Sequence, residues 1–237
     1  MEKQTDHHLV FMPGLDGTGK SFEPLLPFLA ADDRITIVRY PADRILSFEQ
    51  TVSCAAAQMP KDISPVIIAE SFSGPVAVRM IASNQVAARA LVLCATFARS
   101  PHPFLWRIVR GLGLPLLIRP DMPKIFFRFV IGEDRWIDDL MPLWKKVHED
   151  VTPRVMAHRL SLINEVDVTA DLDSLTLPCL YLQATRDRIV PASCLKDYQR
   201  AIRHLQVVSM AAPHFILQAK PQACLDAIFS FLRRQAA

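Results

Sequence analysis

The sequence predicts an α/β fold built on a doubly wound, mostly parallel sheet of about six strands, with helices on both faces and a helical cap insertion. Short β-rich runs alternate along the chain with helical stretches, which is the order expected of a parallel sheet. Most of these runs are continuously apolar, as in strands covered on both faces. A middle stretch of about seventy residues without a good strand is too long for a plain crossover, and it predicts the insertion.

The expected elements follow in order from the N-terminus. Strands are expected at His8–Met12, Ile35–Tyr40, Val66–Glu70, Ala90–Cys94, Cys179–Gln183 and Gln206–Ser209. Helices are expected near Pro24–Ala31, Ser47–Met59, Gly74–Ser83, Ser193–Ala201 and Pro221–Arg233. Between Ala95 and about Val168 the helical pattern is broken repeatedly by prolines, which interrupt the hydrogen bonding of a helix. We therefore expect a core of residues 1–96 and 167–237, with residues 97–166 as a cap or lid.

The composition excludes several classes of protein. Of 237 residues 51% are hydrophobic, and the formal charge of +3 indicates no nucleic-acid partner, because such proteins usually present a clustered basic face. We expect no transmembrane segment and no signal peptide, because no uncharged apolar run is long enough to span a membrane and the N-terminus MEKQTDHH has no apolar region. Five scattered cysteines without a C-x-x-C pair indicate reduced thiols, so we expect a cytoplasmic protein.

A glycine-rich loop follows the first expected strand, in the stretch FMPGLDGTGKS. Residues 14–21 match G-x-x-x-x-G-K-[ST], the phosphate loop of nucleotide hydrolases. In that interpretation a helix should begin near Lys20 and present its N–H groups to phosphate, but Pro24 and Pro27 would then interrupt it. No second strand ends in a convincing acid for Mg²⁺. A nucleotide hydrolase is therefore the disfavoured alternative.

The stretch AESFSG leads from an apolar strand straight into a helix. It fits the pattern small-x-Ser-x-small of a nucleophile elbow, with Ser71 at the centre and Ala69 and Ser73 at the small positions. The residues around the serine must be small because strand and helix pass closely at a sharp turn that exposes the hydroxyl. The alternative is a plain junction in which Ser71 caps the helix.

A nucleophilic serine needs a base, and the base needs an acid that orients it. Asp187 stands just after the strand CLYLQ, and His214 stands in AAPHFILQAKP after the last strand. Ser71, Asp187 and His214 thus occur in the chain order Ser, Asp, His, each after a strand. The alternatives are a turn residue for Asp187 and a structural loop histidine for His214, with Asp167, Asp171 and Asp173 as reserve acids.

These motifs resemble the α/β-hydrolase fold superfamily, of the serine esterase and lipase kind, over nearly the whole chain. DLDSLTLPCLYLQATRDRIVP resembles the approach to the acid of that family, APHFILQAKP its histidine loop and AESFSG its elbow. PGLDGTG together with the flanks of the serine also resembles esterase and acyltransferase-like members that act on acyl lipids. The resemblance implies an oxyanion hole made by the backbone N–H groups of Leu15 and Phe72. It leaves Asp16 without a role.

The expected activity is hydrolysis of a carboxylic ester of a small or acyl-chain substrate through an acyl-enzyme, with Ser71, His214 and Asp187 as the catalytic triad. No metal or organic cofactor is required. A thioesterase or an acyltransferase with the same triad is the close alternative. A non-catalytic binding protein is a further one, against which the intact Ser, Asp and His set argues.

The first part of the expected cap is both basic and apolar. From residue 99 to residue 128 six basic residues accompany a single acid, Asp121. The candidates for lining the substrate pocket are Asp16, Phe104, Trp106, Phe126 and Phe127. A basic, apolar surface suits an anionic partner, either a lipid surface or an acidic acyl-carrier protein. The alternative is an ordinary cap with solvated arginines around a buried apolar face.

Overall fold

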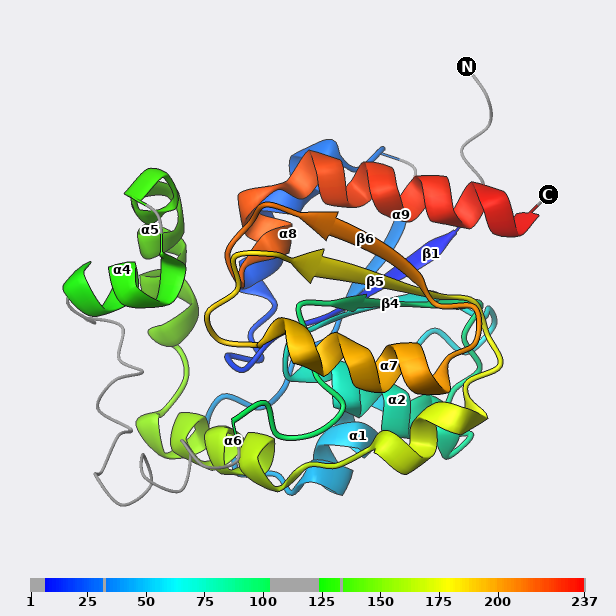
Figure 1. Cartoon of the computed structure of the whole chain (residues 1–237). Coiled ribbons are helices and arrows are strands. Elements are labelled where there is room, and N and C mark those ends of the chain that lie inside the picture. The colour runs from blue at the N-terminus through cyan, green and yellow to red at the C-terminus, as the bar shows by residue number, and fades with distance from the viewer. Residues whose placement is uncertain (1–6, 32, 103–123, 133, 237) are drawn as a thin grey trace.

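A single six-stranded sheet forms the centre of the molecule (Figure 1). The structure, a computed structural model, describes residues 7–31, 33–102, 124–132 and 134–236. All strand pairs are parallel, in the order β2-β1-β3-β4-β5-β6. The strands are β1 (His8–Met12), β2 (Arg34–Ile37), β3 (Val66–Glu70), β4 (Ala90–Cys94), β5 (Cys179–Ala184) and β6 (Gln206–Met210). The chain moves outward in both directions from β1, which confirms the doubly wound parallel sheet.

Helices cover both faces of this sheet (Figure 1). One face carries α1 (Phe48–Ala56), α2 (Ser73–Ala82) and α7 (Leu195–Ala201), with the short 3₁₀ helices η4 (Thr169–Ser174) and η5 (Ala192–Cys194). The other face carries the 3₁₀ helix η1 (Lys20–Phe28), α8 (Ile216–Ala219) and α9 (Pro221–Ala236).

The strands supply both hydrophobic cores at once. In β1, Val10 and Met12 join the core under α1 and α2, whereas Leu9 and Phe11 join the core under η1 and α9. Successive side chains of a strand point to opposite faces, so both sets of positions must be apolar. This alternation explains the continuous apolar runs in the sequence.

Two elements differ most from the sequence expectation. Beyond Ile37 the chain leaves β2 and turns toward the glycine-rich loop, where the Tyr40 N–H donates to the carbonyl of Gly17 (2.8 Å). The helix expected at Pro24–Ala31 is the 3₁₀ helix η1, which begins four residues earlier and contains Pro24 and Pro27. Because Pro24 and Pro27 have no backbone N–H to donate, they interrupt the hydrogen bonding of an α-helix. This short segment forms a 3₁₀ helix instead.

Helices also occupy the stretch between β4 and β5. Its described residues include, before η4, the helices α4 (Lys124–Ile131), the 3₁₀ turn η3 (Asp134–Trp136), α5 (Ile137–His148) and α6 (Pro153–Glu165). Helices α4 and α5 lie beyond the carboxyl ends of β5 and β6, at the left of Figure 1. An isolated bridge between Arg99 and Asp167 brings the two ends of the inserted stretch together. An ion pair between Lys146 of α5 and Glu23 of η1 (2.5 Å) links the insertion to the sheet layers.

The cysteines and the helix lengths complete the description of the fold. All five cysteines are free thiols; four are buried and Cys54 is half-buried. Across the described ranges, none of the helices is both long enough and apolar enough to cross a membrane.

Candidate active site

Three polar side chains follow three parallel strands at one edge of the sheet. Ser71 comes directly after β3, Asp187 lies in the loop after β5, and His214 lies in the loop after β6. The carboxyl ends of parallel strands meet at one edge, where open α/β sheets place their ligand sites. Ser71 and His214 are buried, and the Asp187 side chain is only 5% exposed.

The three side chains form one hydrogen-bonded chain. His214 Nε2 lies 2.9 Å from Ser71 Oγ, and His214 Nδ1 lies 2.7 Å from Asp187 Oδ2. The other carboxylate oxygen of Asp187 accepts the N–H groups of Ile189 (2.7 Å) and Val190 (2.8 Å), which fix its orientation. A carboxylate beside Nδ1 keeps the proton on that nitrogen, so Nε2 is left to accept the serine proton.

Two carboxyl groups influence the charge of His214. Burial disfavours the imidazolium, but the hydrogen-bonded Asp187 and the nearby Glu70 outweigh it and raise the pKa of His214 above its ordinary value. Glu70 ends β3 and is itself buried; burial raises its pKa to about 7, while Gln218 and His214 act in the opposite direction. Sequence reasoning treated Glu70 only as a strand end. A carboxyl at the end of an otherwise apolar strand, directly before Ser71, is the signal that could have found it.

The backbone at Ser71 is strained, and hydrogen bonds from its N–H and its carbonyl hold it in place. Its φ of 49° lies in the left-handed region, which residues other than glycine rarely adopt. The Ser71 N–H donates to the carbonyl of Cys94 (2.9 Å), and the Ser71 carbonyl accepts the hydroxyl of Thr96 (2.5 Å). The N-cap of α2 is Phe72, and the Ser71 hydroxyl is directed to His214. This geometry is that of a sharp strand-to-helix turn that presents its hydroxyl.

The residues after the serine are small for two different reasons. A Cβ added at Gly74 would lie 1.9 Å from Thr96 Oγ1, so only glycine fits there. Ser73 is fully buried, its hydroxyl donates to the carbonyl of Pro13, and its Oγ lies 2.7 Å from the Tyr40 hydroxyl. Because Ser73 has one proton and gives it to Pro13, Tyr40 must donate to Ser73. Ser73 thus ties the elbow to the glycine-rich loop.

The glycine-rich loop passes directly beside Ser71. A Cβ added at Gly14 would lie 3.8 Å from Ser71 Cβ. Within the described part of the chain, the backbone N–H groups of Leu15 and Phe72 donate no hydrogen bond. Neither N–H is engaged by a described residue, and Leu15 and Phe72 stay predicted oxyanion donors.

The Asp16 carboxylate is hydrogen-bonded within its own loop. It is buried, and its Oδ1 accepts the backbone N–H (2.8 Å) and the hydroxyl (2.5 Å) of Thr18. This is a local turn of the kind that aspartate stabilises. The carboxylate that the sequence left without a role, and proposed for the pocket, is thus engaged in shaping the loop.

The lysine of the phosphate-loop pattern has a partner elsewhere in the protein. Lys20 forms an ion pair with Asp150, which follows α5. The segment that begins at Lys20 is a 3₁₀ helix with Pro24 and Pro27 inside, rather than the continuous α-helix of a phosphate loop. This ion pair and this helix type lend no support to the nucleotide alternative.

Only one of the aromatic pocket candidates has a described side chain. Phe127 of α4 is buried and packs edge-on to Trp144 of α5 (5.8 Å between ring centroids). Trp144 in turn meets Phe215, the residue after His214 (6.1 Å). Phe126 lies in α4, and Phe104 and Trp106 lie outside the described residues. Phe127 therefore belongs to an apolar cluster that reaches the histidine loop.

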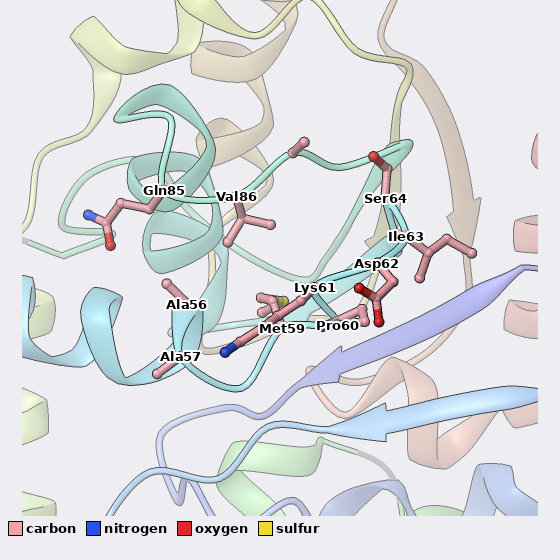
Figure 2. A pocket seen from close by; sticks show the side chains of 11 residues that line it. Ala56, Ala57, Met59, Pro60, Lys61, Asp62, Ile63, Ser64, Gln85 and Val86 are labelled. Atoms are coloured by element: carbon pink, nitrogen blue, oxygen red, sulfur yellow. The ribbon is translucent and has the colours of Figure 1, made fainter.

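A surface cavity of about 480 Å³ lies at the opposite end of β3 from Ser71 (Figure 2). Its walls come from the end of α1, the turn after α2 and the segment that enters β3, with Lys61, Ser64 and Gln85 among the lining residues. None of the residues that the sequence singled out lines this cavity. In the described part of the chain, no group of three or more His, Cys, Asp or Glu residues could hold a metal ion.

The chain is similar to a known esterase along almost its full length. No family model matches it. The pimeloyl-[acyl-carrier protein] methyl ester esterase of Vibrio atlanticus is 23% identical over 249 residues, which cover 95% of this chain and 94% of that protein.

Solved structures share the arrangement of the elements. The enol-lactonase of Burkholderia xenovorans superposes with a TM-score of 0.79 at 17% identity, covering 98% of this chain and 94% of that chain. A thermophilic esterase of Thermogutta terrifontis gives 0.78 at 18% identity, covering 96% and 90%. Both have the α/β-hydrolase fold. This chain likewise has the α/β-hydrolase fold, as its motifs led us to expect.

Proposed function

We propose that this protein is a serine hydrolase that cleaves a carboxylic ester through an acyl-enzyme. The observation that carries the proposal is the buried hydrogen-bonded chain from Ser71 through His214 to Asp187, with Ser71 on a strained turn. Such strain persists only where the surroundings hold it, and it is common at functional sites. The similarity to a methyl ester esterase supports the ester as the bond that is cleaved.

The proposed first step forms the acyl-enzyme. His214 Nε2 takes the proton from Ser71 Oγ as the oxygen attacks the acyl carbon. Asp187 stabilises the imidazolium through its hydrogen bond with Nδ1. The N–H groups of Leu15 and Phe72 receive the negative oxygen of the tetrahedral intermediate. The imidazolium then protonates the leaving alcohol, and the acyl group remains on Ser71.

The second step releases the acid. His214 removes a proton from water, which attacks the acyl carbon, and the same two N–H groups stabilise the second tetrahedral intermediate. The proton returns to Ser71 Oγ as the carboxylic acid leaves. A thioester would follow the same two steps with a thiol as leaving group, and acyl transfer would replace water with an alcohol.

Residues 97–166 are proposed to cap this site. The cluster of Phe127, Trp144 and Phe215 extends from α4 and α5 to the histidine loop, which suits an apolar acyl portion of the substrate. We also propose an anionic partner for the basic part of the cap, either an acidic carrier protein or a lipid surface. Binding to such a partner should weaken steeply as salt is raised, and an absence of any salt effect would count against it.

A panel of aryl esters and acyl thioesters of graded chain length tests the proposed reaction. We expect turnover of at least one ester by the unaltered protein and a loss on the order of 10⁴-fold or more in kcat for Ser71→Ala. Ser53→Ala, which alters an exposed serine of α1, serves as the matched control and should be fully active. Equal activity of Ser71→Ala and the unaltered protein would disprove the assignment of the nucleophile. No turnover of any member would disprove the substrate class.

A further inference from the structure

Arg159 of α6 is a buried cation whose guanidinium group reaches the backbone of two loops. It is 5% exposed. Its Nη1 donates to the carbonyls of Leu15 (3.1 Å) and Asp16, and its Nη2 donates to the carbonyl of Pro41 (2.7 Å). The guanidinium carbon also lies 5.7 Å from the centre of the Tyr40 ring. One side chain of the inserted stretch thus fastens the loop that carries the Leu15 N–H.

Gly17 is shaped to admit this guanidinium. A Cβ added at Gly17 would lie 2.6 Å from Arg159 Nη1, and the residue has a φ of 70°, which disfavours any other side chain. The Gly17 N–H donates to the Gly14 carbonyl (3.2 Å), which closes the turn around Leu15. The middle glycine of PGLDGTG is therefore explained by Arg159 and by the turn, and not by a phosphate.

The same loop is anchored from its other side by the elbow. The Ser73 hydroxyl donates to the Pro13 carbonyl, and Tyr40 donates to Ser73 (2.7 Å). Burial raises the pKa of Tyr40, which keeps its hydroxyl protonated and able to donate. The Leu15 N–H thus lies between an anchor at Pro13, which comes from the elbow, and an anchor at residues 15 and 16, which comes from α6.

We propose that Arg159 is a positioning residue for oxyanion stabilisation, and that α6 acts on the chemical step through it. The proposal rests on the proposed function, because it assumes that the Leu15 N–H receives the oxyanion. The Leu15 and Asp16 carbonyls belong to the two peptide units that follow the one carrying the Leu15 N–H, and Arg159 holds both carbonyls through Nη1. A donor displaced by about 1 Å loses much of its effect in the transition state, because that effect depends on a fixed geometry. Arg159 itself touches neither the substrate nor the reacting atoms.

Substitution of Arg159 should therefore change kcat more than KM. We expect Arg159→Met to lower kcat by about tenfold to a hundredfold while KM stays within about threefold, because the affected interaction forms in the transition state. Arg159→Lys, which keeps the charge but loses the fork that bridges the carbonyls, should fall in between. Arg154→Met changes an exposed arginine of the same helix and should leave both constants unaltered. An unaltered kcat in folded Arg159→Met overturns the proposal, and if that variant does not fold, Arg159→Lys decides in its place.

Amide hydrogen exchange separates this proposal from the proposed function. The N–H groups of Gly17 and Thr18 are hydrogen-bonded within the loop, so their exchange reports its order without any substrate. Exchange at these amides should accelerate at least tenfold in Arg159→Met, or in Arg159→Lys if the former does not fold, and stay unaltered in Arg154→Met. Unaltered exchange in the Arg159 variants overturns the positioning role even if esters are cleaved. If exchange is faster in the Arg159 variants but the unaltered protein cleaves no ester, Arg159 still anchors the loop, and its role in oxyanion stabilisation is rejected.

Discussion

Replacement of Glu70 by glutamine should change how stability depends on pH. Glu70 lies at the end of β3, directly before Ser71, and is 4% exposed. Its Oε1 has no hydrogen-bond partner among the described residues. An ionised carboxylate in such a place loses its hydration without full compensation, so the folded protein favours the protonated acid. Glutamine has nearly the same shape and remains neutral at every pH.

The size of this change in the free energy of unfolding follows from the pKa of the Glu70 carboxyl in the folded and unfolded states. Burial raises the pKa of Glu70 from 4.5 to about 7 on folding. Below pH 4.5 Glu70 is protonated in both the folded and the unfolded chain, and its full contribution to the free energy of unfolding is present. Between pH 4.5 and about 7 the unfolded chain releases the proton and the folded chain keeps it, so stability falls as pH rises. The difference in pKa corresponds to about 3 kcal/mol at 25 °C.

Urea unfolding at several pH values from 5 to 8 measures this difference. Between the ends of that range, the free energy of unfolding of the unaltered protein should fall by about 2 to 3 kcal/mol relative to Glu70→Gln. Glu165→Gln, an exposed substitution at the end of α6, should follow the unaltered protein. If the free energies of unfolding of Glu70→Gln and the unaltered protein change with pH in parallel, the claim that the buried Glu70 carboxyl has a raised pKa is refuted.

Three further predictions concern the site itself. Glu70→Gln should move the acid limb of the kcat/KM profile to lower pH, because the fraction of Glu70 that is ionised near pH 7 raises the pKa of His214; an unmoved limb would show that the two groups are not coupled. Asp187→Asn should lower kcat on the order of 10³-fold to 10⁴-fold with little change in the melting temperature, measured by ester turnover and circular dichroism, and near-normal turnover would exclude Asp187 as the orienting acid. Gly74→Ala should reduce the free energy of unfolding by about 1 to 3 kcal/mol, measured in urea, because its Cβ meets Thr96, and an unchanged value would contradict the close packing.

The inner strands of the sheet were predictable because they are buried on both faces. The runs at β1, β3 and β4 were predicted to the residue, since continuous apolar segments bounded by turns leave little choice of limits. The segment after the glycine-rich loop was placed wrongly, because a helical pattern that contains Pro24 and Pro27 does not reveal that the chain adopts 3₁₀ geometry from Lys20 onward. Local composition cannot resolve the two helix types over so short a stretch.

The three polar residues were predictable because the topology brings strand ends together, so their order along the chain was sufficient. The order of residues along the chain does not show which loops lie close together in the fold. The contacts of Arg159 and Ser73 with the glycine-rich loop could therefore not be predicted. Arg159 did leave a signal: it occupies the buried stripe of α6 with Val155, Met156, Leu162 and Ile163. An arginine in an apolar stripe must find acceptors in the interior, although the sequence does not say which.

Covalent labelling with a serine-directed fluorophosphonate, followed by mass spectrometry of the intact protein and its peptides, tests the central claim most directly. We predict one adduct per chain, located on Ser71, and no adduct on Ser71→Ala. His214→Ala should label far more slowly, because the hydroxyl then lacks the base that lies 2.9 Å away. A protein that cleaves esters yet gains no adduct, or carries it on another residue, would contradict the assignment of Ser71 as the nucleophile.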